Sequence, residues 1–459
     1  MTGTLARVRN KLRATLWPLP TLGLVAAIAL GVAVPELDRR LDGSMPGWLS
    51  SAIFNGDAAA ARTVLDAVSS SLITVTSLTF SLTVVTLQLA SSQFSPRLLR
   101  TFSSDLFVQV TLAIFLSTFV YSLTVLRLIR SADGSASPFV PRVAVTLAFL
   151  LAVTSVFALV LFLAHLARMI RVESMLRNVH REASATMRSA LPGRTRTDDP
   201  DETVPSVPST AETVLAVESG FLTGTNEAEL LHAATRAGAV VLLDAQPGDF
   251  VVEGVPVARV WSDQRGRLST DQRDVLARKV TDSMSVGFER TSGRDIGFGL
   301  RQLTDVANKA LSPGINDPTT AVHAIGHLAV LLCEAADRQL GPRLLRDDDD
   351  RLRVVASGPS FADLVEVAIT QPRRYGASDP QVAGQLFRLL AQLAWRVPAE
   401  LHPVVVEHLG RLESSVAAQD YDPAEVELLA RHGAQVRSTL HDRHRHPHLN
   451  SDPDPDRSV

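Results

Sequence analysis

The sequence predicts an α-helical membrane domain of four transmembrane helices, followed by a cytoplasmic α+β region. Three observations lead to this fold class. Four uncharged windows in the first 170 residues reach the roughly 20 residues that a helix needs to cross a hydrocarbon core of about 30 Å. Short β-like runs separated by Gly and Pro begin near residue 213. From about residue 266 the apolar residues recur at three-and-four spacing, which is typical of helices.

The composition fits a membrane protein with a large polar part. The 459 residues carry a formal net charge of −3, and 46% of them are apolar. The apolar residues are densest in the first 170 residues. The balanced charge gives no reason to expect nucleic acid as a partner. The single cysteine, Cys333, excludes a disulfide framework and a cysteine-based zinc site. It lies in an apolar helical run and is expected to fill the core.

The four windows define a transmembrane domain over residues 15–170, after a basic cytoplasmic N-terminus at residues 1–14. Charged residues flank each window: Arg13 and Glu36, Asp66 and Arg97, Asp105 and Arg127, and Arg142 and Arg168. Basic residues precede the first window, as in a signal peptide, but no small-residue cleavage site follows and three more windows do. The first window is therefore expected to be a retained helix.

Basic residues near the helix ends indicate the orientation in the membrane. They cluster before the first window, between the second and third, and after the fourth. With four spans these three segments share one side, and positively charged segments stay in the cytoplasm. We therefore expect a multi-pass protein of the bacterial inner membrane with both termini cytoplasmic.

The second window is rich in hydroxyl groups. Ser or Thr occupies twelve of the positions from 69 to 93, and no charge occurs between Asp66 and Arg97. Positions three and four apart share a helix face, so one polar stripe runs along this helix: Ser70, Thr74, Ser77, Ser81, Gln88, Ser92 and Gln93. A second row lies beside it: Ser69, Thr76, Thr79, Thr83 and Thr86. These residues either pack against other helices, in one chain or in a homo-oligomer, or line a pore.

The rest of the chain divides by pattern into four segments. Residues 171–212 read as a linker that ends rich in Pro, Thr and Asp. Residues 213–265 read as a small β-rich module, with Asn226 capping a short helix and Gly238 ending it. The PGDFVVEGVPVARV run is similar to half of a biotinyl/lipoyl-type barrel sandwich, but no Lys is present for a swinging arm. A mainly helical domain is expected over 266–440 and a disordered tail over 441–459.

A polar elbow follows the helical run at 301–311. Pro313 and Gly314 break the helix, and Asp317 with Pro318 has the residue types of a new helix start. The simplest interpretation is a corner between two helices. The alternative is that the elbow binds a partner, an ion or a small ligand through eight candidate residues: Asp305, Asn308, Ser312, Pro313, Gly314, Asn316, Asp317 and Pro318.

The following helix carries two histidines at the spacing of zinc ligands. His323 and His327 are four residues apart, and Glu334 would have to act as a third ligand. The metalloprotease pattern needs Glu after the first His, where this chain has Ala324. We therefore expect no metal and no cofactor.

Two long stretches resemble signatures of a bacterial family of predicted membrane proteins, domain of unknown function 2254. They are FSLTVVTLQLASSQFSPRLLR at 80–100 and GFGLRQLTDVANKALSPGINDPTTAV at 297–322. The similarity covers about residues 10–435 and includes a PGDFV-type module and an RRYG segment at 373–376. It implies the same architecture, with no settled activity to transfer. The residues that match are Gln88, Ser91, Ser92, Gln93, Phe94, Pro96, Arg97, Arg301, Gln302, Asp305, Leu311, Ser312, Pro313, Gly314, Asn316, Asp317 and Pro318.

The sequence favours a non-enzymatic membrane function. It has no P-loop, no dinucleotide fingerprint, no serine-nucleophile motif and no recognisable pair of catalytic carboxylates. One hypothesis is an oligomeric channel or passive transporter in which the second helix lines the pore and the cytoplasmic region regulates it. The alternative is a membrane-anchored cytoplasmic sensor or scaffold without transport. Besides the lipid bilayer, the expected partner is a second copy of the chain, and the ligand is unknown.

Overall fold

The computed structural model describes residues 17–41, 53–93, 105–129, 139–169, 171–193, 204–263 and 267–445. The chain forms two compact units, Met1–Ser174 and Met175–Val459. The predicted N-terminus at 1–14 and most of the predicted tail lie outside the described residues.

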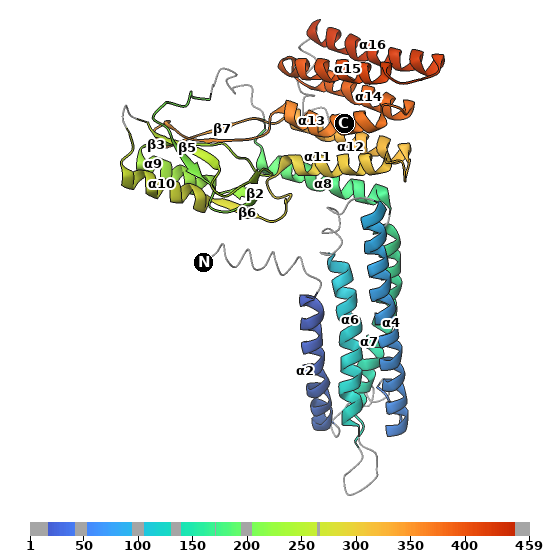
Figure 1. Ribbon diagram of the computed structural model, residues 1–459. Coiled ribbons are helices and arrows are strands. Elements are labelled where there is room, and N and C mark those ends of the chain that lie inside the picture. The colour runs from blue at the N-terminus through green and yellow to red at the C-terminus, as the bar shows by residue number, and fades with distance from the viewer. Residues whose placement is uncertain are drawn as a thin grey trace, which may run out of the picture. The chain divides into compact units, whose positions relative to one another are not determined.

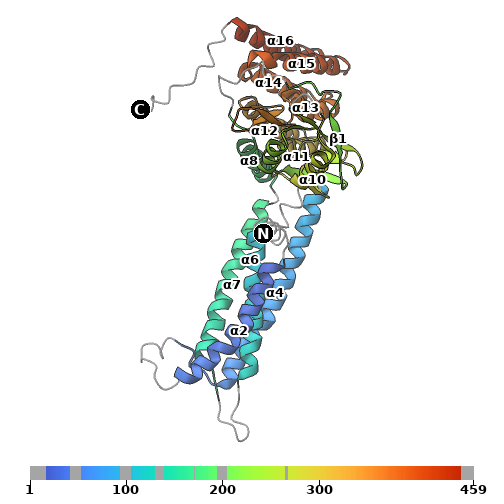
Figure 2. The same cartoon turned by 90° about the vertical axis from the view of Figure 1, so that its left-hand side faces the viewer.

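The first unit is a bundle of long apolar helices. They are α2 (Pro18–Leu41), α4 (Ala58–Gln93), α6 (Leu106–Leu128) and α7 (Arg142–Met169). Helix α6 contacts the other three, and all four run side by side (Figure 1, Figure 2). Asp105 begins α6, where its carboxylate accepts hydrogen bonds from the N–H groups of Phe107 and Val108. The described part of each of the four predicted windows lies mainly in one of these helices.

Five described helices are long and apolar enough to cross a membrane: these four and α12 (Pro318–Ala336) of the second unit. Helix α12 differs in its surroundings. Half of its most apolar window is buried inside the chain, against 17–44% for the other four. It packs on α11, α13 and α14 within its own unit. We therefore treat α12 as a core helix of the second unit.

The bundle is held by close packing and by a few polar contacts between helices. Gly23 and Gly31 of α2 let its backbone approach Ser117 and Thr124 of α6. Thr118 and Ser155 join α6 to α7 through hydroxyl oxygens 3.2 Å apart. In lipid such small residues and hydrogen bonds drive helix association, because apolar contact gains little there. The outward faces of α2, α4 and α7 carry exposed Leu, Val, Ile and Phe side chains.

The second unit contains a five-stranded sheet with the order β1-β5-β3-β8-β7. Its strands are β1 (Glu212–Leu215), β3 (Ala239–Leu243), β5 (Pro256–Ser262), β7 (Arg343–Arg346) and β8 (Leu352–Ala356). Neighbours are antiparallel except β3 and β8. Helices α9 (Glu227–Ala237) and α10 (Thr270–Ser283) lie on one face of the sheet (Figure 1). Leu230 and Leu276 pack there on Val241 and Val354. As predicted, Asn226 caps α9, and Gly238 ends it in the left-handed conformation.

The strands of residues 213–265 do not form the expected barrel-sandwich-like module. They are divided between the five-stranded sheet and a three-stranded sheet, β4 (Phe250–Val251), β2 (Gly220–Thr225) and β6 (Met284–Gly287), in that order. The reason is long-range pairing, because β3 is buried along its whole length and pairs in parallel with β8 from a distant part of the chain. A strand buried on both faces needs neighbours that the local pattern does not show.

Helix α8 (Val172–Ala190) occupies much of the segment expected to be a linker at 171–212. Its buried residues recur at helical spacing and include Met175, Val179, Ala183 and Met187. Charged residues occupy the other side, so the apolar stripe is narrow. The linker prediction was wrong here because the count of charges hid this periodicity.

The remaining helices form a stack (Figure 1). They are α11 (Ile296–Ala310), α12, α13 (Phe361–Gly376), α14 (Pro380–Arg396), α15 (His402–Ala417) and α16 (Pro423–Arg445), with a short 3-10 turn at Ala399–Leu401. Each helix packs on its neighbours in the stack. Helix α16 extends to Arg445, so the predicted tail at 441–459 begins inside a helix.

Candidate functional site

The predicted polar stripe of α4 lies on the outside of the bundle. Ser70, Thr74, Ser77, Ser81 and Gln88 are all exposed. Within this stripe, the hydroxyl of Thr74 donates to the carbonyl of Ser70 at 3.1 Å. Such bonds to the helix's own backbone lower the cost of placing a hydroxyl in lipid. The side chains of Ser92 and Gln93 lie outside the described part of α4.

The second hydroxyl row of α4 faces the other helices of the bundle. Ser69, Thr79 and Thr86 are buried, and Thr76 and Thr83 are half-buried. Packing inside the bundle therefore uses this row and leaves the first stripe uncovered by the chain's own described helices. Sequence periodicity found both rows but could not decide which one faces inward.

His165 pairs with the residue that begins α6. Its Nε2 lies 2.8 Å from Oδ2 of Asp105, and its ring centroid is 4.6 Å from that of Phe107. Both polar side chains are about a quarter exposed, at 28% and 20%. His165 lies near the end of the fourth apolar window, and its pairing with Asp105 was not predicted from the sequence.

The predicted elbow is a compact turn between α11 and α12. Asp317 caps α12, accepting a hydrogen bond from the N–H of Thr320 at 3.0 Å and from its hydroxyl at 2.6 Å. Pro318 takes the first helical position, and Asn316 adopts φ +50°. The hydroxyl of Ser312 donates to the carbonyl of Lys309. These bonds explain why such residues form a corner, and a ligand role for the elbow stays a prediction.

The other predicted elbow residues lie apart from one another. The side-chain amide of Asn308 donates to Oε1 of Gln371 on α13 at 2.6 Å. Pro313 and Gly314 are exposed at the tip of the turn, and Asp305 is half-buried one turn before Asn308. The structure therefore brings Asp317 and Pro318 together at the helix start but directs Asn308 toward a different helix.

His327, one of the two histidines of α12, contacts α8. The ring of His327 lies 5.0 Å from the ring of His180, centroid to centroid. Glu334 accepts hydrogen bonds from the hydroxyl of Ser184 at 2.6 Å and from Nη1 of Arg188 at 3.1 Å. Over the described ranges, no three His, Cys, Asp or Glu residues come close enough to hold a metal ion.

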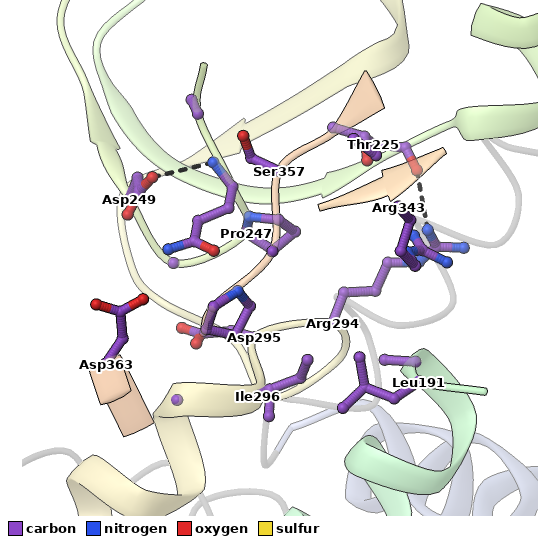
Figure 3. A pocket seen from close by; sticks show the side chains of 18 of the residues that line it. Leu191, Thr225, Pro247, Asp249, Arg294, Asp295, Ile296, Arg343, Ser357 and Asp363 are labelled. Carbon is purple, nitrogen blue, oxygen red and sulfur yellow. Dashed lines mark hydrogen bonds between the residues drawn. The ribbon is translucent and has the colours of Figure 1, made fainter. Parts of the chain in front are cut away.

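A cavity of about 290 Å³ lies among loops of the second unit (Figure 3). Its walls come from the ends of α8, β2, β3 and β8 and from the first turns of α9, α11 and α13. The first N–H groups of a helix lack partners within the helix, so three helix starts bring donors and partial positive charge to this wall. Both apolar and polar side chains line the cavity.

Two arginines share one carboxylate on one side of the cavity. Nη1 of Arg294 lies 3.4 Å from Oε1 of Glu227 and also donates to the carbonyl of Thr225 at 3.2 Å. Arg343 pairs with the same oxygen of Glu227. One negative charge therefore faces two positive charges, which leaves a local excess of positive charge.

A buried ion pair forms the middle of the cavity wall. Both Nε and Nη2 of Arg290 lie 2.7 Å from Oδ2 of Asp295, whose side chain is only 3% exposed. Burial raises the pKa of Asp295, and the neighbouring Arg290 opposes that rise. The backbone of Gly248 packs against this ion pair. Gly248 has φ +101°, and a Cβ there would lie 2.6 Å from Oδ2 of Asp295. Only glycine fits this backbone without strain.

Two further carboxylates line the opposite side. Asp249 accepts a hydrogen bond from the N–H of Gln246 at 3.0 Å. Asp363 accepts from the N–H and the hydroxyl of Ser360, at 2.9 Å and 2.7 Å. In Figure 3 these two residues lie across the cavity from Arg294 and Arg343. Sequence reasoning missed the whole cavity; the PGD turn at 247–249 was the one local signal near it.

Comparison with known proteins places the chain among predicted membrane proteins. Residues 13–392 match the family model described as "Predicted membrane protein (DUF2254)". The uncharacterized proteins Rv1290c of Mycobacterium tuberculosis and Mb1321c of Mycobacterium bovis are each 36% identical over 388 residues, 84% of this chain and 73% of theirs. No solved structure matches the chain.

Proposed function

The chain belongs to the DUF2254 family of predicted membrane proteins, and from that premise we propose that it is a channel or passive transporter. In this proposal α2, α4, α6 and α7 cross the bacterial inner membrane, with both termini in the cytoplasm. Several copies assemble so that α4 of each lines a shared path, and the second unit regulates that path from the cytoplasmic side.

The observation that carries this proposal is the exposed polar stripe of α4. Ser70, Thr74, Ser77, Ser81 and Gln88 occupy one face of a helix whose other hydroxyl row is already used in packing. A single copy in lipid would turn these groups, including an amide, toward acyl chains. Polar side chains in a membrane usually face other helices or a water-filled cavity. A ring of copies around an axis supplies such a cavity.

The residue types of the stripe indicate the kind of permeant. Hydroxyl and amide groups offer hydrogen bonds without a fixed charge. Between Asp66 and Arg97 the chain has no acidic or basic side chain, and such side chains usually mark proton relays and ion-coupled transport. The stripe therefore suits passive movement of small polar solutes or weakly selected ions.

Flux through purified protein in liposomes tests the proposal. The wild-type protein should conduct small solutes or ions above empty vesicles. Ser77→Leu and Ser81→Leu should lower the flux severalfold by narrowing the path and making it apolar. Ser71→Leu is the matched control, because it makes the same change at an exposed position about 100° around the same helix. Absence of flux for every solute, or equal loss in the Ser71 variant, would contradict the pore.

The second candidate function is a membrane-anchored sensor or scaffold. The cavity of the second unit favours it, because a sensor needs a ligand site and transport does not. Two measurements on the same protein, flux and the response to ligand, separate the two functions. A protein that shows no flux but changes its oligomeric state or stability when a cytoplasmic ligand is added would be a sensor.

A further inference from the structure

We propose that the cavity of the second unit binds a small amphoteric molecule, with an anionic group at one end and a protonated amine at the other. The cavity is formed entirely by residues of the second unit, between Ser189 and Val367. Its volume of about 290 Å³ is at the lower end of the range for small-molecule sites. This site is separate from the transport path proposed above.

The anionic end of the ligand would meet Arg294 and Arg343. Both guanidinium groups pair with the single carboxylate of Glu227, so one unit of positive charge is left uncompensated there. These contacts use one nitrogen of each side chain, and a guanidinium has five N–H donors. The first turn of α9, which starts at Glu227, adds its partial positive charge on the same side. A carboxylate fits this forked arrangement of donors.

The cationic end of the ligand would meet Asp249 and Asp363. Their hydrogen bonds come from neutral donors, the backbone of Gln246 and the backbone and hydroxyl of Ser360. Among the residues that the structure describes, neither carboxylate forms an ion pair. The start of α13, where Asp363 belongs to the capping box, offsets only part of these two negative charges. A protonated amine between them would supply the rest. A second anionic group at this end would be repelled.

The wall between the two ends suits a short carbon chain. Arg290 and Asp295 neutralise each other there. Leu191, Pro247 and Ile296 also line the cavity, and Figure 3 shows Pro247 and Ile296 between the arginine side and the Asp249–Asp363 side. A ligand with charges of opposite sign at its two ends therefore complements the cavity, and one with two like charges does not.

Matched ligands of equal length test this inference on the full-length protein in detergent micelles. The first set is γ-aminobutyrate, succinate and putrescine, and the second is ε-aminocaproate, adipate and hexamethylenediamine. Isothermal titration calorimetry and thermal melting should show that at least one amino acid binds. Its Kd should be at least tenfold lower than those of the diacid and the diamine of the same set. If neither amino acid binds at millimolar concentration, or if a diacid or diamine binds equally well, the inference is wrong.

Variants at each end assign the two ends independently. Arg343→Gln should weaken binding of the amino acid at least tenfold. The diamine should then bind better, relative to the amino acid, than it does to the wild type. Asp249→Asn should weaken binding of the amino acid by a similar factor. The diacid should then bind better, relative to the amino acid, than it does to the wild type. Arg273→Gln and Asp274→Asn on α10 make the same changes outside the cavity and should leave the affinity unchanged. Thermal melting without ligand checks that each variant folds. If a variant does not fold, the comparison of the matched ligands on the wild-type protein still decides the outcome.

Discussion

The imidazole rings of His180 on α8 and His327 on α12 lie 5.0 Å apart with an angle of 53° between their planes. Burial lowers the pKa of both side chains, and for His327 the neighbouring His180 lowers it further. Glu334 raises the pKa of His180 but does not overcome burial. Both rings are therefore neutral near pH 7, and protonation of either one opposes the contact between α8 and α12.

Acid should weaken this contact in a defined pH window. In the unfolded chain both histidines have the ordinary pKa of 6.5, above their folded values. Below that pH the unfolded chain binds protons that the folded chain does not, so stability is full above pH 6.5 and falls as the pH approaches the lowered folded values. The melting temperature should fall between pH 7.5 and 5.5 in the wild type and fall less in His180→Gln.

A distant histidine gives the control for this measurement. His441 on α16 is exposed, so His441→Gln should keep the pH dependence of the wild type. Arg177, Arg188, Glu334 and His323 also act electrostatically on the pair, and none of them changes in either variant. If His180→Gln and His441→Gln gave the same pH dependence, the ring pair would not be its source.

Asp317→Ala should destabilise the second unit by about 1 kcal/mol, the usual cost of losing a helix N-cap. The hydroxyl of Thr320, then its N–H, lowers the pKa of Asp317 below 3.8. The stabilisation by the ionised carboxylate is thus present above that value and is lost as the pH falls toward the lowered folded pKa. Urea unfolding at neutral pH measures the loss, and Asp348→Ala at an exposed position serves as control. An unchanged midpoint in Asp317→Ala would show that the cap contributes nothing.

Local patterns in the sequence predicted the parts of the fold that depend on local interactions. Only neighbouring residues are needed for the helices at the four apolar windows, for the caps at Asn226 and Asp317 and for the end of α9 at Gly238. All of these are present. The parallel pairing of Val241 with Val354 is different. Each strand alone is a short apolar run, and nothing in either one specifies the other as its partner.

The cavity was beyond sequence reasoning for a similar reason. Arg294 and Arg343 meet at Glu227 only because three loops converge beside the two sheets. Each residue is an ordinary charged side chain in its own segment. In contrast, the stripe of α4 was predictable because a helix places its residues on faces at fixed spacing. Its outward direction depends on which side the other helices cover.

Gly31→Val should loosen the packing of α2 on α6. A Cβ at residue 31 would lie 2.8 Å from Cβ and Cγ2 of Thr124, so the two helices would have to separate. Overpacking of this kind costs roughly 1–3 kcal/mol. Thermal melting of the purified protein in detergent measures the effect, and Ala29→Val at an exposed position of the same helix should be close to neutral. Thr124→Ala should restore part of the loss in Gly31→Val, and no rescue would argue against this contact.

Gly248→Ala should destabilise the second unit through two separable effects. The backbone at Gly248 has φ +101°, which an L-residue adopts only with strain, and its Cβ would lie 2.6 Å from Oδ2 of Asp295 and 2.8 Å from Nη2 of Arg290. Gly254 has φ +77° with nothing within 4 Å of a Cβ, so Gly254→Ala measures the backbone effect alone.

We expect Gly254→Ala to cost about 1 kcal/mol and Gly248→Ala about 1–3 kcal/mol more, because a buried ion pair must also move. Chemical unfolding of the full-length protein gives both values under one set of conditions. At Gly314 φ is ordinary and no atom lies within 4 Å of a Cβ. Gly314→Ala should therefore be close to neutral, which gives the baseline for a Gly→Ala change without strain or clash. Equal losses in Gly248→Ala and Gly254→Ala would mean that the loop moves away freely and that the Arg290–Asp295 pair does not depend on Gly248 for its position.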